Sequence, residues 1–121
     1  MELNVTQIGT KTVAEVLADG VVVHTPQDAL DLLATVQYEH EATCLLLGEG
    51  HLAPEFFNLK TGLAGDILQK YANYGMKLVV TGDFGGVRSR SLRALILESN
   101  RGRQVAFVSD RAAAIAHIAA W

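Results

Sequence analysis

The chain has 121 residues, of which half are hydrophobic and 19% are charged. This length is sufficient for one domain with its own core, and this composition excludes an intrinsically disordered chain. The N-terminus lacks a basic stretch followed by an apolar one, and no apolar run is long enough to span a bilayer. We therefore expect a cytoplasmic protein without a membrane span. The single cysteine, Cys44, lies in an apolar run and predicts a packed, inert thiol.

The net charge of −3 conceals an asymmetry along the chain. Residues 1–83 carry eleven acidic residues and four lysines, whereas residues 84–121 carry six arginines and two acidic residues. The simplest interpretation is a solvated surface with ion pairs to the acidic part of the chain. Because the net charge is negative and the arginines are not interleaved with aromatic residues, we do not expect nucleic acid as a partner.

The first elements in chain order are predicted strands. Residues 3–8 and 11–17 flank the pair Gly9-Thr10, which favours a β-hairpin. The β-branched run 21–23 follows a second turn signal and predicts a short strand.

A helix is predicted next. Thr25 is a suitable N-cap, Pro26 suits the first helical position, and the helix is expected to end near His40. Its expected buried face consists of Ala29, Leu32 or Leu33, and Val36.

The middle of the chain predicts a strand, a helix and a second strand. Residues 43–47 and 76–81 are short apolar runs, typical of strands covered on both faces. Between them, residues 52–59 form a connection of uncertain form, and Gly75 is expected to end the helix. One face of this helix is expected to carry Leu63, Ile67, Tyr71 and Tyr74.

The last third predicts a glycine- and arginine-bearing loop at 84–90, then a helix, a strand at 104–108 and a final helix. Ser89 or Ser91 is expected to cap the first of these helices, and Gly102 to end it. Asp110 is expected to cap the alanine-rich final helix. The expected inward positions are Leu92, Leu95, Ile96 and Ser99 in the former helix and Ile115, Ile118 and Trp121 in the latter.

This order of elements predicts one α/β domain over residues 1–121. The sheet should be mixed, with an N-terminal hairpin followed by parallel strands that alternate with helices. Parallel crossovers should be right-handed.

Two stretches of the sequence resemble an uncharacterised bacterial family that is filed as a domain of unknown function. They are residues 54–65, PEFFNLKTGLAG, and residues 98–103, ESNRGR, with Ser91-Leu92 as a third, shorter match. This resemblance covers nearly the whole chain and implies a lineage without a biochemical function.

The layout also resembles the STAS, or SpoIIAA-like, fold of anti-sigma-factor antagonists. In that fold a buried strand leads into a helix that begins with a phosphorylatable serine. Here Lys60-Thr61-Gly62-Leu63 occupies the helix start, and Asp110 resembles the final cap. The resemblance implies that Thr61 stands where the phosphorylatable serine stands. The chain departs from the pattern at Lys60, which replaces the first serine, and at Leu59, which replaces an aspartate.

A phosphoacceptor at Thr61 is chemically reasonable. A phosphate there would lie near a helix N-terminus, where the helix dipole and free backbone amides stabilise negative charge, with Lys60 and Gly62 on either side. The alternative is that Thr61 simply caps the helix.

A second candidate site lies where the parallel strands end. His51 is a candidate acid, base or ligand, Asp83 is its candidate partner, and Arg88 and Arg90 form a candidate anion clamp. The alternative is that these loops are ordinary turns.

The sequence favours no metal site, no cofactor and no catalytic residue. The four histidines lie in separate elements without ligand spacing, and no nucleophile motif is present. Phe56 and Phe57 are interpreted as core residues, with an apolar pocket or a dimer face as the alternative.

These observations predict a non-catalytic regulatory or binding module, switched at Thr61, that acts on a protein partner. The second interpretation is a binder of a small anionic or amphipathic ligand, or a minor enzyme, that uses His51, Asp83, Arg88 and Arg90. The third is a homo-oligomeric interaction protein, such as a homodimer, that buries Phe56, Phe57 or Trp121.

Overall fold

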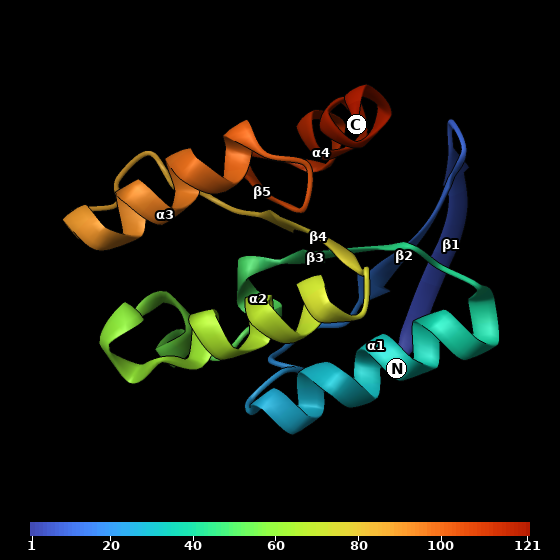
Figure 1. The fold of residues 1–121 in the computed structure, drawn as a ribbon, viewed down its shortest axis with the longest axis horizontal. Helices are drawn as coiled ribbons and strands as arrows, with labels where there is room; N and C mark the ends of the chain where they lie inside the picture. The colour runs from blue at the N-terminus through green and yellow to red at the C-terminus, as the bar shows by residue number, and fades with distance from the viewer.

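The computed structural model describes all of residues 1–121 and is organised around one mixed sheet with strand order β1-β2-β3-β4-β5 (Figure 1). β1 pairs antiparallel with β2, and the remaining neighbours are parallel, as the sequence predicts. The strands are β1 (Glu2–Ile8), β2 (Lys11–Leu17), β3 (Cys44–Gly48), β4 (Lys77–Thr81) and β5 (Val105–Val108). The helices are α1 (Pro26–His40), α2 (Leu63–Asn73), α3 (Arg90–Arg101) and α4 (Arg111–Ala120). Three short 3-10 helices, η1 (Glu49–His51), η2 (Pro54–Phe57) and η3 (Leu59–Thr61), fill the connection between β3 and α2.

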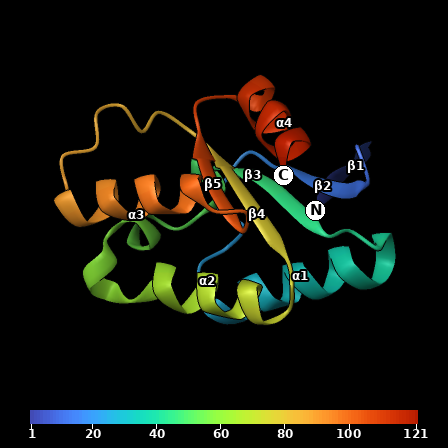
Figure 2. The ribbon, with the colours of Figure 1, turned by 45° about the horizontal axis from the view of Figure 1, so that its top comes forward.

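The helices divide unequally between the two faces of the sheet. Each crossover from β2 to β5 advances by one strand in the same direction, so crossovers of one hand carry α1, α2 and α3 to the same face. α4 follows the last strand and packs alone on the opposite face, as Figure 2 shows for α4 against α1 and α2. The sheet is therefore covered by three helices on one face and by one on the other.

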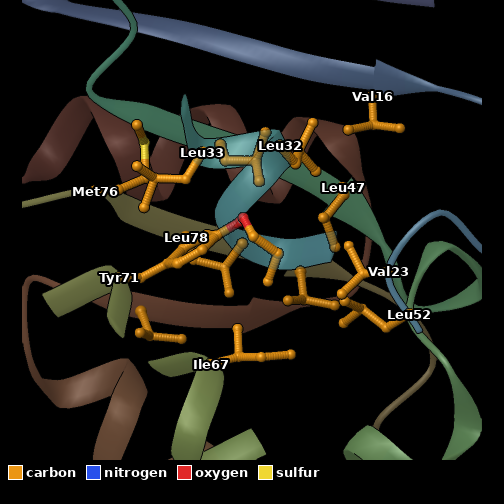
Figure 3. Packing of buried hydrophobic residues seen from close by; sticks show 14 of the residues in the cluster. Val16, Val23, Leu32, Leu33, Leu47, Leu52, Ile67, Tyr71, Met76 and Leu78 are labelled. Carbon is orange, nitrogen blue, oxygen red and sulfur yellow. The ribbon is translucent and has the colours of Figure 1, made fainter. Parts of the chain in front are cut away.

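The larger core lies between the sheet and α1, α2 and α3. It contains 20 buried hydrophobic residues, several of which converge in Figure 3. The Tyr71 hydroxyl lies within this core and donates to the carbonyl oxygen of Ala29 at 2.7 Å, which joins α2 to α1. Burial raises the pKa of Tyr71 above its ordinary value, so this hydroxyl keeps its proton. A smaller core of 7 buried residues lies under α4 and includes Cys44, Ala114 and Ile118.

The predicted helix caps are present. Thr25 accepts a hydrogen bond from the Asp28 amide at 3.1 Å, and Ser89 accepts one from the Leu92 amide at 3.2 Å. Asp110 similarly caps α4, and Gly75, with φ of 69°, ends the turn after α2. These signals act within one helical turn, which is why they are readable from the sequence.

Two local predictions are wrong. Residues 21–23 do not form a strand of the sheet; a single bridge joins Val23 to Leu52, because the amides of Val22 and Val23 both donate to the His51 carbonyl oxygen. Tyr74 does not join the buried face of α2, because the helix ends at Asn73 and leaves the Tyr74 side chain 59% exposed.

The two edge strands of the sheet, β5 and β1, differ in whether a side chain hydrogen-bonds to their outward backbone groups. On β5, the side-chain amide of Asn100 in α3 accepts from the Phe107 amide at 2.7 Å and donates to the Phe107 carbonyl oxygen at 3.0 Å. The side chain thus takes the place of a neighbouring strand at this residue. β1 forms the other edge and has no comparable cover.

Candidate functional site

The carboxyl ends of β3, β4 and β5 meet at one edge of the sheet, where open α/β sheets commonly bind ligands. η1 follows β3, a turn that begins at Gly82 follows β4, and Asp110 caps α4 after β5. This is the edge at which the sequence predicts a site.

The imidazole ring of His51 is held by backbone groups at both nitrogens. Nδ1 accepts from the Gly48 amide at 2.9 Å, and Nε2 lies 2.7 Å from the carbonyl oxygen of Ala18. Because a carbonyl oxygen only accepts hydrogen bonds, we assign the proton to Nε2 and the ring to its neutral form. His51 therefore ties the end of β3 to the segment that follows β2, and both nitrogens are engaged in the fold.

Glu49 connects the first two loops of this edge. Its carboxylate accepts from the Asp83 amide at 3.3 Å, and its side chain lies over Gly82. A Cβ at Gly82 would come within 2.6 Å of the Glu49 carboxyl carbon, so glycine permits this close approach. This role of Glu49 was not predicted from the sequence.

Asp83 is occupied within its own turn, where its carboxylate accepts from the Gly85 amide at 3.3 Å. Arg88 and Arg90 are exposed, and neither forms an ion pair or hydrogen bond with Asp83 or His51. The four predicted residues thus share one end of the sheet but do not form a joined cluster.

Aromatic packing anchors the loop that carries these arginines. Phe84 packs against Phe57 and Phe107, with ring centroids 6.1 and 5.5 Å apart, and Phe57 packs edge-on against Phe56 at 5.0 Å. Phe56 is fully buried. The interpretation of Phe56 as a core residue is confirmed, and it is not available for a dimer face.

The hydroxyl of Thr61 joins η2, η3 and α2. Its oxygen lies 2.8 and 2.9 Å from the carbonyl oxygens of Glu55 and Asn58, and it accepts from the Leu63 amide at 3.2 Å. The N-cap itself is Gly62, so Thr61 bonds to the first turn of α2 from one position further upstream than predicted. The side chain is exposed, as is the neighbouring Lys60. A phosphoryl group on this oxygen would replace the proton that the two carbonyl oxygens share.

We expect Thr61→Val to lower the free energy of unfolding by about 1–2 kcal/mol, because it removes the hydroxyl without changing the side-chain shape. Thr61→Ser keeps the hydroxyl and serves as the control, with stability close to that of the wild type. Urea denaturation followed by circular dichroism measures both. Equal stabilities of the valine and serine variants would contradict a structural role for this hydroxyl.

A small cavity of about 110 Å³ with a mixed polar and apolar lining lies at the same edge and includes Arg111 of α4. Arg111, at the start of α4, donates from Nε to both carboxylate oxygens of Glu15 at 3.1 and 3.0 Å. A cavity of this size suits water or a small ion, because typical sites for organic ligands are roughly 300–1,000 Å³. Neither residue was predicted from the sequence, although Glu15 is the only charge in the run 12–17.

The Glu15–Arg111 pair is the only ion pair that an arginine makes. The prediction that the arginines pair with the acidic part of the chain is therefore wrong for the other five, which are exposed. Three of these recur along the outer face of α3 with an exposed leucine, at the spacing of one helical stripe. We call this surface the arginine stripe; it consists of Arg90, Arg93, Leu97 and Arg101. Of these residues only Arg90 was a predicted site residue, although the spacing of all four along one helical face is visible in the sequence.

Metal binding and thiol chemistry are two further candidate functions. No group of three or more His, Cys, Asp or Glu side chains is close enough to hold a metal ion. Burial raises the pKa of the Cys44 thiol to about 12, against a smaller opposing effect of Lys77 and Lys11. The predicted packed thiol is confirmed, and so high a pKa leaves little reactive thiolate. None of the helices is long and apolar enough to cross a membrane.

The largest cavity, of about 420 Å³, lies away from this edge, between β1 and α1. Because this cavity separates the two elements, α1 does not pack closely over β1. Its lining combines an apolar floor with carboxylates and includes Leu3, Val22, Leu32, Asp28, Asp31 and Glu39.

Comparison with known families finds one match. A family model described as a domain of unknown function, DUF4180, matches residues 8–118. Comparison with curated proteins finds no match, and comparison with solved structures finds none either. Because the family model covers nearly the whole chain, the chain belongs to the DUF4180 family.

Proposed function

We propose that this chain is a non-catalytic binding module that docks an acidic segment of a partner protein on the arginine stripe of α3. One observation carries the proposal: three guanidinium groups flank an exposed leucine, and no acidic side chain of the chain pairs with them. Exposed charges attract little individually, but a row of unpaired ones favours a partner of opposite sign.

The dimensions of the stripe suit a short segment. Arg90 and Arg101 are eleven residues apart on a helix, so their Cα atoms are separated by about 16 Å. This length corresponds to about five residues of an extended chain or three turns of a helix. Guanidinium groups bind carboxylates through paired hydrogen bonds, and Leu97, which is 56% exposed, provides an apolar contact between them.

Three features favour an acidic protein segment over nucleic acid. The chain carries a net charge of −3, which opposes long-range attraction of a polyanion. The stripe contains no aromatic residue on which a base could stack. Leu97 at its centre matches an apolar side chain better than a phosphate backbone.

The STAS-like fold and the regulatory role are part of the same proposal. Sequential strand order, an antiparallel N-terminal strand and an exposed Thr61 just before α2 support them. Phosphorylation of Thr61, beside Lys60 and Gly62, would disturb its bonds to Glu55 and Asn58 and so affect the turns that precede α2.

The alternative is a small anionic or amphipathic ligand bound by His51, Asp83, Arg88 and Arg90. The separation of these side chains and the engagement of both His51 nitrogens favour the protein partner.

The test measures binding of a short fluorescent peptide of alternating glutamate and leucine by anisotropy. Arg93→Glu combined with Arg101→Glu is expected to weaken binding at least roughly tenfold, or about 1.4 kcal/mol. Lys60→Glu is the matched control, because it reverses one exposed charge outside the stripe and should change the affinity much less than Arg93→Glu alone.

Three outcomes would overturn the proposal. They are absence of peptide binding, an equal loss in the Lys60→Glu control, and tighter binding of a single-stranded oligonucleotide than of the peptide at the same salt concentration. Circular dichroism verifies that the variants are folded, which we expect because the substituted side chains are exposed.

A further inference from the structure

β1 is a long strand at an open edge of the sheet. It has seven residues, against four in β5, and Asn100 covers β5 but no side chain covers β1. Natural proteins commonly protect exposed edges with lysine, proline, a bulge or a covering segment. β1 contains neither lysine nor proline, and its register with β2 is continuous without a bulge.

The hydrogen-bond pattern between β1 and β2 determines which backbone groups of β1 point away from β2, toward the open edge. Thr12 of β2 directs its carbonyl oxygen away from β1, toward the Thr43 amide at 2.9 Å. Because the direction alternates along a strand, its partner Gln7 also points away from β2. Leu3, Val5 and Gln7 therefore present unpaired N–H and C=O groups at the open edge, with Val5 in the middle.

We propose that β1 pairs antiparallel with β1 of a second copy of this chain, across a two-fold axis at Val5. In this register Leu3 lies opposite the partner's Gln7, and Val5 lies opposite the partner's Val5. All the outward groups of both strands then face one another, which allows about six new backbone hydrogen bonds. The two sheets become one, and the exposed Val5 side chains pack against each other.

The charges of the hairpin agree with this register. Glu2 is the only charged residue of β1, and antiparallel pairing places it opposite the partner's Ile8, at the far end from the partner's Glu2. Ile8 is opposite Lys11 within its own hairpin, so Glu2 lies on the same face of the sheet as the partner's Lys11, two strands away. The Lys11 ammonium donates to the Trp121 carbonyl oxygen at 2.7 Å and keeps its positive charge at that end of the hairpin. Parallel pairing would instead bring the two Glu2 side chains together.

Pairing of two edges alone buries less surface than a stable interface, which needs roughly 1,200–2,000 Å². We therefore expect a weak dimer that forms reversibly as concentration rises. On that face α1 lies across the cavity from β1 and does not cover the edge strand closely.

Sedimentation equilibrium over a range of protein concentrations tests the proposal. The wild type is expected to shift from monomer to dimer, and Val5→Pro and Val5→Lys to stay monomeric. The Val5 amide points outward, so proline there removes no hydrogen bond within the chain. Lysine at the same position keeps the backbone unchanged and protects the edge by charge. Tyr74→Lys is the control, because it adds the same charge at an exposed position after α2 and should leave the dimer intact.

Single cysteines report the register. Val5→Cys should cross-link to itself in oxidised glutathione, because directly opposite Cα atoms lie about 5.5 Å apart. Gln7→Cys alone should not, since it faces the partner's Leu3, but a mixture of Gln7→Cys and Leu3→Cys should. The buried Cys44 does not compete.

A wild type that stays monomeric at every concentration would overturn the proposal, and so would a dimer that persists in both Val5→Pro and Val5→Lys. Efficient cross-linking of Gln7→Cys alone would contradict the antiparallel register. This inference is independent of the arginine stripe, since neither Val5 variant alters α3.

Discussion

Replacement of Phe56 by alanine is expected to lower the free energy of unfolding by about 3–5 kcal/mol. Phe56 is fully buried in the larger core and packs edge-on against Phe57. Removal of its ring leaves a cavity that the surrounding residues fill only in part, so lost burial and lost packing both contribute. Urea denaturation followed by Trp121 fluorescence measures the change, since this is the only tryptophan and it packs against His117.

Phe57→Ala is the matched control, because it removes the same ring from the adjacent, partly buried position. A smaller loss is expected there. Equal losses at the two positions would contradict the assignment of Phe56 to the core. A large loss at Phe56 also means that this side chain contributes more than Phe57 to the attachment of the turns before α2 to the core.

Replacement of His51 by phenylalanine is expected to lower the free energy of unfolding by about 2–4 kcal/mol. The ring of phenylalanine fills the same space but leaves the Gly48 amide and the Ala18 carbonyl oxygen without the partners they have in the wild type. Unpaired polar groups in a partly buried position cost more than the bonds themselves contribute.

Two further variants, His51→Asn and His51→Gln, separate the contributions of the Nδ1 and Nε2 hydrogen bonds to stability. Asparagine has an acceptor at the position of Nδ1 and so retains the bond from Gly48, whereas glutamine has a donor at the position of Nε2 and retains the bond to Ala18. Each is expected to lose less stability than phenylalanine. If phenylalanine is tolerated as well as the two amides, the ring is not structural, and the candidate acid–base role of His51 regains support.

The two longer stretches that resemble a family of unknown function contain residues that hold the fold together, and both lie within the range matched by the DUF4180 model. In residues 54–65, Phe56 fills the core and Thr61 joins three helical segments. In residues 98–103, Asn100 covers the edge of β5. These three residues stabilise the fold, whereas the proposed binding surface on the outer face of α3 shares only Arg101 with the two stretches.

Most of the secondary structure was predictable because its signals are local. The caps at Thr25, Ser89 and Asp110, and the stop at Gly75, each act within about one turn of a helix. The short apolar strands and the single antiparallel edge strand follow equally from patterns within a few residues.

The rest depends on contacts between residues far apart in the chain. Residues 21–23 have the composition of a strand, but the amides of Val22 and Val23 donate to the backbone carbonyl oxygen of His51 instead of to a strand of the sheet. No pattern within the run predicts this contact with a distant residue. The sequence suggested chemistry at His51 because of its residue type, whereas the structure engages both nitrogens with backbone groups. The arginines looked available for pairing with the acidic residues, yet only Arg111 reaches one, at Glu15. The sequence by itself therefore determined that the two parts of the chain carry opposite charges. Only the tertiary structure decided that the arginine stripe has no acidic partner, because α3 packs with this face toward solvent and no acidic side chain forms an ion pair with it.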